Sequence, residues 1–114
     1  MSFIIYTTTD LGELSHLLEG QLEGAVVKEL SIEEGALAQK TFGLKYNPFL
    51  YIKKASESKR ENIVKRLVAE GLFATVINEH GKIVEDYNGE GVIHYHPRII
   101  RIVEPTQMDA RVNP

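Results

Sequence analysis

The sequence predicts an α+β domain, and three observations lead to that prediction. Short runs of β-branched and aromatic residues alternate with two stretches of helical apolar periodicity. Glycine, proline and asparagine separate these runs, as expected for turns. The resulting order is strand, helix, strand, loop, strand, helix, strand. This is the split βαβ pattern of a ferredoxin-like βαββαβ core, an antiparallel sheet with two helices on one face, here extended by one or two C-terminal strands.

The first third of the chain predicts a strand, a helix and a second strand. Residues 3–9 are rich in β-branched and aromatic side chains, which favour a strand. Asp10 then offers a helix N-cap, with Glu13 at the capping-box spacing. The apolar face of this helix consists of Leu11, Leu14, Leu17 and Leu18. Two glycines end the helix, and residues 25–32 form the second strand.

The segment 33–47 is the least regular part of the sequence. It contains two glycines and ends on an Asn-Pro pair, and both features interrupt regular structure. We therefore expect a long loop, with room for a short helical turn over residues 35–40. The third strand follows at 48–53, where Pro48 fits at the first position because no ladder donor is needed there.

The second predicted helix has the clearest periodicity in the chain. Ser56 and Ser58 each offer an N-cap, and Ser58 has Glu61 at the capping-box spacing. Its apolar stripe consists of Ile63, Val64, Leu67 and Val68. Gly71 closes the helix.

The last part of the chain predicts three strands and a tail. Strands at 72–77 and 82–87 are joined by a turn that contains glycine, as a hairpin requires. A long strand over 92–103 follows a second glycine-rich turn. We assign residues 1–105 to a single domain and residues 106–114 to a polar C-terminal tail.

Composition excludes several classes of protein. The chain has 114 residues, a formal net charge of −3 and no cysteine. Disulfides, thiolate metal sites and a cysteine nucleophile are therefore excluded. Nucleic-acid binding is not expected without a basic bias, because the basic residues at 58–66 are diluted by glutamates. No apolar run approaches the ~20 residues of a membrane span, and the first residues lack the features of a signal peptide. We expect a cytoplasmic protein without a membrane partner.

Part of the chain resembles the CutA proteins. Tyr6-Thr7-Thr8 is similar to the end of their first strand. Tyr51-Ile52 and residues 67–78, followed by 81–86, are similar to their strand–helix–strand–hairpin unit. The resemblance implies the ferredoxin-like fold and the trimeric assembly that CutA shares with the PII-like signalling proteins. The tryptophan-rich hairpin of that family has no counterpart, because this chain contains no tryptophan.

Two histidines on the last predicted strand are the strongest candidates for chemistry. His94 and His96 are two residues apart, so on a strand both point to the same face. Such a pair could bind a metal ion if a third ligand were supplied. Candidates from nearby turns and strands are His80, Asp86, Glu90 and Glu104. None of them has a recognised ligand spacing, so we expect no metal and no cofactor.

The same pair could serve as a general acid and base. Arg98 or Arg101 would then hold a phosphate ester for cleavage. The chain lacks the two separate H-x-S/T motifs of two-histidine phosphoesterases, so the residues favour binding over catalysis. A small phosphoesterase or a metal-dependent enzyme that uses His94 and His96 stays the alternative.

A binding function uses the same strand without turnover. Arginine forms bidentate contacts with phosphate, and tyrosine stacks on a base. We therefore expect a nucleotide-like anionic ligand, over which the loop at 33–47 could close. The candidate ligand-binding residues are Lys45, Tyr51, His94, Tyr95, His96, Arg98 and Arg101.

These observations favour a small, non-enzymatic binding or regulatory protein. It would recognise an anionic small molecule or a protein partner, as a sequestering or inhibitory accessory protein does. The strand at 92–103 is too apolar to lie at an open sheet edge, so a second copy of the chain is expected to cover it. This predicts a homo-oligomer, a dimer or a trimer.

Overall fold

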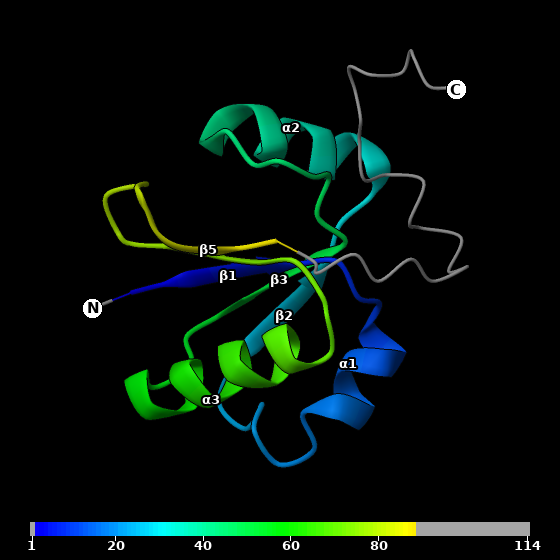
Figure 1. Ribbon diagram of the computed structural model, residues 1–114, viewed down its shortest axis with the longest axis vertical. Coiled ribbons are helices and arrows are strands. Elements are labelled where there is room, and N and C mark those ends of the chain that lie inside the picture. Colours follow the sequence, from blue (N-terminus) through cyan, green and yellow to red (C-terminus); the bar gives the residue numbers. More distant parts are fainter. Residues whose placement is uncertain (1, 89–114) are drawn as a thin grey trace.

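A computed structural model describes residues 2–88 of the chain, with three helices and five strands in that range (Figure 1). The predicted strand at 92–103 and the tail at 106–114 lie outside the described residues. In chain order the elements are β1 (Ile4–Thr7), α1 (Leu11–Leu17), β2 (Val26–Glu29), α2 (Ile32–Phe42), β3 (Leu50–Lys53), α3 (Glu57–Ala69), β4 (Ala74–Ile77) and β5 (Ile83–Tyr87).

The five strands form one antiparallel sheet with the order β2-β3-β1-β4-β5. β1 lies in the centre, where Tyr6 is opposite Tyr51 of β3 on one side and Thr75 of β4 on the other. Every connection between described strands except the β4–β5 hairpin contains a helix. The α+β class is therefore confirmed.

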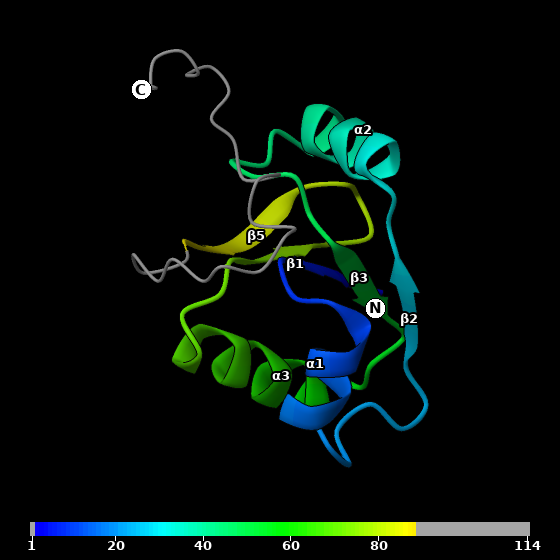
Figure 2. The same ribbon diagram turned by 90° about the vertical axis from the view of Figure 1, so that its right-hand side faces the viewer.

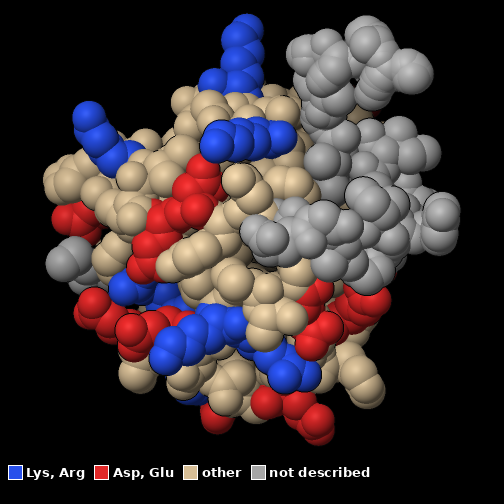
Figure 3. All heavy atoms as spheres, viewed as in Figure 1, with Lys and Arg blue, Asp and Glu red and all other residues tan. Residues whose placement is uncertain are grey.

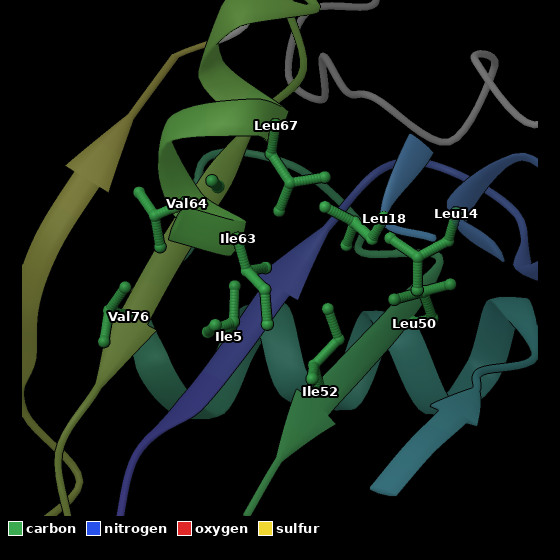
Figure 4. Packing of buried hydrophobic residues seen from close by; sticks show 10 residues of the cluster. Ile5, Leu14, Leu18, Leu50, Ile52, Ile63, Val64, Leu67 and Val76 are labelled. Carbon is green, nitrogen blue, oxygen red and sulfur yellow. The ribbon is translucent and has the colours of Figure 1, made fainter. Parts of the chain in front are cut away.

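The helices lie on both faces of the sheet. α1 and α3 pack side by side on one face, and α2 lies alone on the opposite face (Figures 1 and 2). The first face is closed by an aliphatic core to which both helices and three strands, β1, β3 and β4, contribute buried residues (Figure 4). Its buried members are Ile5, Leu14, Leu18, Leu50, Ile52, Ile63, Val64, Leu67, Ala74 and Val76. The leucines and the α3 stripe that the sequence periodicity selects thus pack against the sheet, apart from Leu11, which is exposed.

The predicted long loop at 33–47 is wrong, because most of it is the helix α2. Ser31 accepts a hydrogen bond from the backbone N–H of Glu34, and the Glu34 side chain accepts one from the backbone N–H of Ser31. This capping box satisfies two backbone N–H groups at the start of the helix. It also ends the preceding strand earlier than the predicted range 25–32. Gly43 ends the helix in the left-handed conformation at φ 73°, which glycine adopts without a steric penalty.

The second apolar cluster packs α2 and its C-terminal connection onto the sheet. Its buried members are Tyr6, Leu30, Ala38, Leu44, Tyr46 and Ile77. Phe42 is partly buried at the end of α2, with its ring 5.8 Å from that of Tyr6. The connection between α2 and β3 is therefore anchored in the core.

The predicted hairpin turn is present, and one of the two alternative caps of α3 is selected. Asn78 accepts hydrogen bonds from the backbone N–H groups of His80 and Lys82, and Gly81 has φ 78° in the turn before β5. α3 begins after Ser56, whose side chain accepts from the backbone N–H of Lys59. Ser58 and Glu61 therefore lie inside the helix and do not cap it. No helix within residues 2–88 is long and apolar enough to cross a membrane.

Candidate functional site

The ligand site predicted from the sequence is only partly within the described residues. His94, Tyr95, His96, Arg98 and Arg101 lie outside them, so their assignment to a site stays a prediction. Lys45 and Tyr51 are described. Lys45 lies in the connection from α2 to β3, and Tyr51 lies in β3 and packs against the second apolar cluster.

Tyr51 is half-buried in the middle of β3. Its ring meets that of Tyr6 edge-on at 5.8 Å, and the Nζ of Lys53 lies 5.4 Å from the Tyr51 ring centroid. A cation at this distance from an aromatic ring is attracted by the ring's quadrupole. An aromatic surface and a positive charge are therefore adjacent on this face of β3.

Lys45 is exposed, but its neighbours in the chain are not. Leu44 is buried in the second cluster, and Tyr46 is fully buried. The segment that we expected to close over a ligand is thus fixed to the sheet on both sides of Lys45. The hypothesis of a closing loop at 33–47 is wrong for this reason.

Tyr46 belongs to a buried chain of hydroxyl groups that the sequence did not indicate. Its hydroxyl donates to the backbone carbonyl of Tyr6 at 3.0 Å and lies 2.7 Å from Thr75 Oγ1. Thr75 in turn donates to Asp86 Oδ1 at 2.8 Å. Each hydroxyl carries one proton, so Tyr46 donates either to the Tyr6 carbonyl or to Thr75, and Thr75 donates either to Asp86 or to Tyr46. These hydrogen bonds link the α2–β3 connection to β1, β4 and β5.

Burial raises the pKa of the Tyr46 hydroxyl far above its ordinary value, and the nearby Asp86 carboxylate raises it further. The hydrogen bond with Thr75 acts in the opposite direction but does not offset burial. Tyr46 therefore stays protonated and acts as a hydrogen-bond donor at any physiological pH. This group is suited to holding the fold together and not to acid–base chemistry.

Arg60 connects α3 to the edge strand β5. Its side chain is only 13% exposed, and its guanidinium forms ion pairs with Glu85 at 3.1 Å and Glu57 at 3.6 Å. The guanidinium carbon also lies 4.2 Å from the centroid of the Phe3 ring. Most of the charge and surface of Arg60 is therefore used within the fold.

The described residues contain no group of three or more His, Asp or Glu side chains that could hold a metal ion. His80, a candidate third ligand, lies exposed in the turn before β5 beside Glu79. Asp86, another candidate, accepts the hydrogen bond from Thr75. Neither residue is therefore part of a metal-binding cluster within residues 2–88.

Basic and acidic side chains are interspersed on the face of the molecule that Figure 3 shows. Figure 3 shows lysines and arginines over α2 and α3 with acidic groups between them. Ion pairs join Lys28 to Glu34 and Arg66 to Glu70. Part of the basic charge in residues 2–88 is therefore balanced by neighbouring carboxylates.

Five of the seven large apolar side chains exposed within residues 2–88 lie on two surfaces, and the other two are Leu11 and Val26. The edge strand β5 carries Ile83, Val84 and Tyr87, of which Val84 is 47% exposed. Val84 is also the extra residue of a bulge, because Ile83 is opposite Ile77 while Glu85 is opposite Val76. The second surface is the side of α2 that faces away from the sheet, where Leu37 is 66% exposed.

Comparisons with protein-family models, with curated proteins and with solved structures find no match to this chain.

Proposed function

We propose that this chain is a non-enzymatic binding protein that recognises an extended segment of a partner protein along the edge of β5. The observation that carries the proposal is the position of β5 as the outermost strand of the sheet formed by residues 2–88, with three large apolar side chains exposed. The proposal requires that the predicted strand at 92–103 leaves this edge open. An edge strand offers backbone N–H and C=O groups to another strand, and this is a recurring mode of peptide recognition.

The charges of β5 specify the kind of segment that fits. Glu85 is paired with Arg60, whereas Asp86 is exposed and accepts one hydrogen bond from Thr75. Like charges directly opposite each other destabilise a strand pair. A partner segment with apolar residues opposite Ile83 and Val84, and a basic residue opposite Asp86, is therefore favoured.

Selection from a displayed library of short peptides tests this proposal. Peptides that bind the wild-type chain are expected to bind Val84→Asp at least about tenfold more weakly, because the change places a charge in the apolar contact. Val26→Asp is the matched control, since Val26 is a 40% exposed valine on the opposite edge strand β2. The proposal is contradicted if no peptide is enriched, or if Val84→Asp and Val26→Asp lose peptide affinity equally.

Recognition of an anionic small molecule is the second candidate function, and the Lys53–Tyr51 pair favours it. An aromatic ring and a phosphate could bind there together with the predicted residues at 94–101. Titration with a panel of nucleotides tests this candidate. Lys53→Ala is expected to weaken binding, and Lys65→Ala, at an exposed position of α3, is expected to leave it unchanged. Recovery of a converted nucleotide would instead favour the enzymatic alternative that uses His94 and His96.

The fold itself is proposed to be a ferredoxin-like core with two additions. The order β2-β3-β1-β4, antiparallel throughout, together with α1 and α3 on one face, supports this assignment. In that interpretation α2 and β5 are the elements that the core does not require. Additions of this kind are where binding functions are commonly placed.

A further inference from the structure

The outer face of α2 has a charge pattern that is complementary to itself. We define this face by Glu33, Ala36, Leu37 and Lys40, all of which are exposed. The spacing i, i+3, i+4, i+7 places the four residues on one side of a helix. The opposite side, which includes the buried Ala38, packs toward the sheet. Figures 1 and 2 show that α1 and α3 lie on the other face of the sheet, away from α2.

Two features make this face unusual for a surface in water. Leu37 is 66% exposed and Ile32, one helical turn before Ala36, is 60% exposed, the two highest values among the large apolar side chains described. Neither Glu33 nor Lys40 forms an ion pair with another residue of the described range. Within residues 2–88, the apolar group therefore stays exposed and neither flanking charge is used in an ion pair.

We infer that α2 pairs with α2 of a second copy of this chain, in antiparallel orientation about a two-fold axis between Ala36 and Leu37. Glu33 and Lys40 lie at equal distances on either side of this point, and their separation along the helix is about 10.5 Å. The two-fold operation places Glu33 of each copy against Lys40 of the other, and Leu37 of each copy against Ala36 of the other, with the two Leu37 side chains adjacent on either side of the axis. Ala36 is small, so the two helices can approach closely.

The size of the contact sets its strength. A helix of 11 residues is about 16 Å long, which is too short for the roughly 1,200–2,000 Å² buried by a standard stable interface. The dimer is therefore expected to be weak and to dissociate on dilution. Added salt weakens it further, because exposed ion pairs are screened.

This dimer is independent of the proposed peptide site, because α2 and the edge of β5 are different surfaces. If the protein dimerises but enriches no peptide, the inferred dimer stands and the proposed function fails. If the protein enriches peptides but remains a monomer, the proposed function stands and the inferred dimer fails.

Sedimentation velocity on the full chain tests the inference. Protein concentrations from about 10 µM to about 500 µM cover the range in which a dimer with a small interface is expected to associate. The wild type is expected to shift from monomer to dimer within this range. Leu37→Lys is expected to abolish the shift, since it places two like charges together at the axis. The exposure of Leu37 means that this variant keeps its fold, which circular dichroism checks.

Charge reversal makes the test specific to the proposed orientation. Glu33→Lys alone, or Lys40→Glu alone, replaces two attractions with two repulsions and is expected to weaken self-association by about tenfold or more. An equimolar mixture of the two variants is expected to associate again. In the mixed dimer, each position 33 and the position 40 that faces it carry opposite charges, so both attractions are restored.

The matched controls are Glu61→Lys and Lys65→Glu, which reverse exposed charges on α3 and are expected to leave the dimer unchanged. A wild type that stays monomeric at every concentration overturns the inference. It is also overturned if the single reversals on α2 associate as the wild type does, or if their mixture associates no better than its two components, since the contact would then lie elsewhere on the chain.

Discussion

Removal of one buried hydroxyl, by Tyr46→Phe, tests how the α2–β3 connection is held to the sheet. The ring keeps its place in the second apolar cluster, so the change isolates the hydrogen bonds to Thr75 and to the Tyr6 carbonyl. Each intramolecular hydrogen bond contributes about 0.5–1.5 kcal/mol net. Thr75 keeps its bond to Asp86, so the partner left behind is not wholly unpaired. We expect a loss of about 1–2 kcal/mol in the free energy of unfolding.

Urea denaturation measures this loss, as a lower midpoint at an unchanged slope. Tyr87→Phe is the matched control, because its hydroxyl donates to Glu85 at an exposed position. Its effect is expected to stay within about 0.5 kcal/mol. A double-mutant cycle of Tyr46→Phe with Thr75→Val should give a coupling energy of at least about 0.5 kcal/mol. Equal stability of wild type and Tyr46→Phe, or no coupling, would refute the buried hydroxyl chain.

The same hydroxyl and the Arg60 contacts give two further expected outcomes. The raised pKa of Tyr46 means that, above the ordinary tyrosine pKa of about 10, the unfolded chain binds fewer protons than the folded one, so stability falls as pH rises. The difference in free energy of unfolding between wild type and Tyr46→Phe should therefore shrink between about pH 10 and pH 11, by up to about 1.4 kcal/mol per pH unit. Parallel urea titrations measure this difference, and a constant value would contradict the raised pKa. Arg60→Ala removes the ion pair with Glu85 and the packing against Phe3. This change should lower the free energy of unfolding by about 1–2 kcal/mol. Arg66→Ala, which removes an exposed pair on the same helix, should change stability by less than about 0.5 kcal/mol in the same denaturation experiment.

The candidate sites differ in how far the sequence reveals them. Tyr51 stands out in the sequence as an aromatic residue beside lysines, and the structure places Lys53 near its ring. Tyr46 escapes sequence reasoning when the surrounding segment is treated as a loop. A signal is present nonetheless: Leu44 and Tyr46 alternate with a lysine, the pattern of a chain with one face against a core.

The helix α2 is also within reach of sequence reasoning. Ser31 and Glu34 have the capping-box spacing, and Gly43 suits a helix end. The glycines at 35 and 43 resemble breakers, but Gly35 lies buried inside the helix. Local propensity disfavours glycine there by about 1 kcal/mol, which packing of α2 against the sheet offsets.

By itself the sequence determined the α+β class, the order of β1, α1, β2, β3, α3, β4 and β5, and the faces that α1 and α3 bury. These follow from apolar periodicity and from capping residues, which act over a few positions along the chain. Only the tertiary structure decided that α2 covers the second face, that Tyr46 reaches Thr75 and Asp86, and that β5 is the outermost of the described strands. The contacts of the hydroxyl chain join residues 11 to 40 positions apart, and no local pattern specifies which distant backbone or side chain will meet a buried hydroxyl.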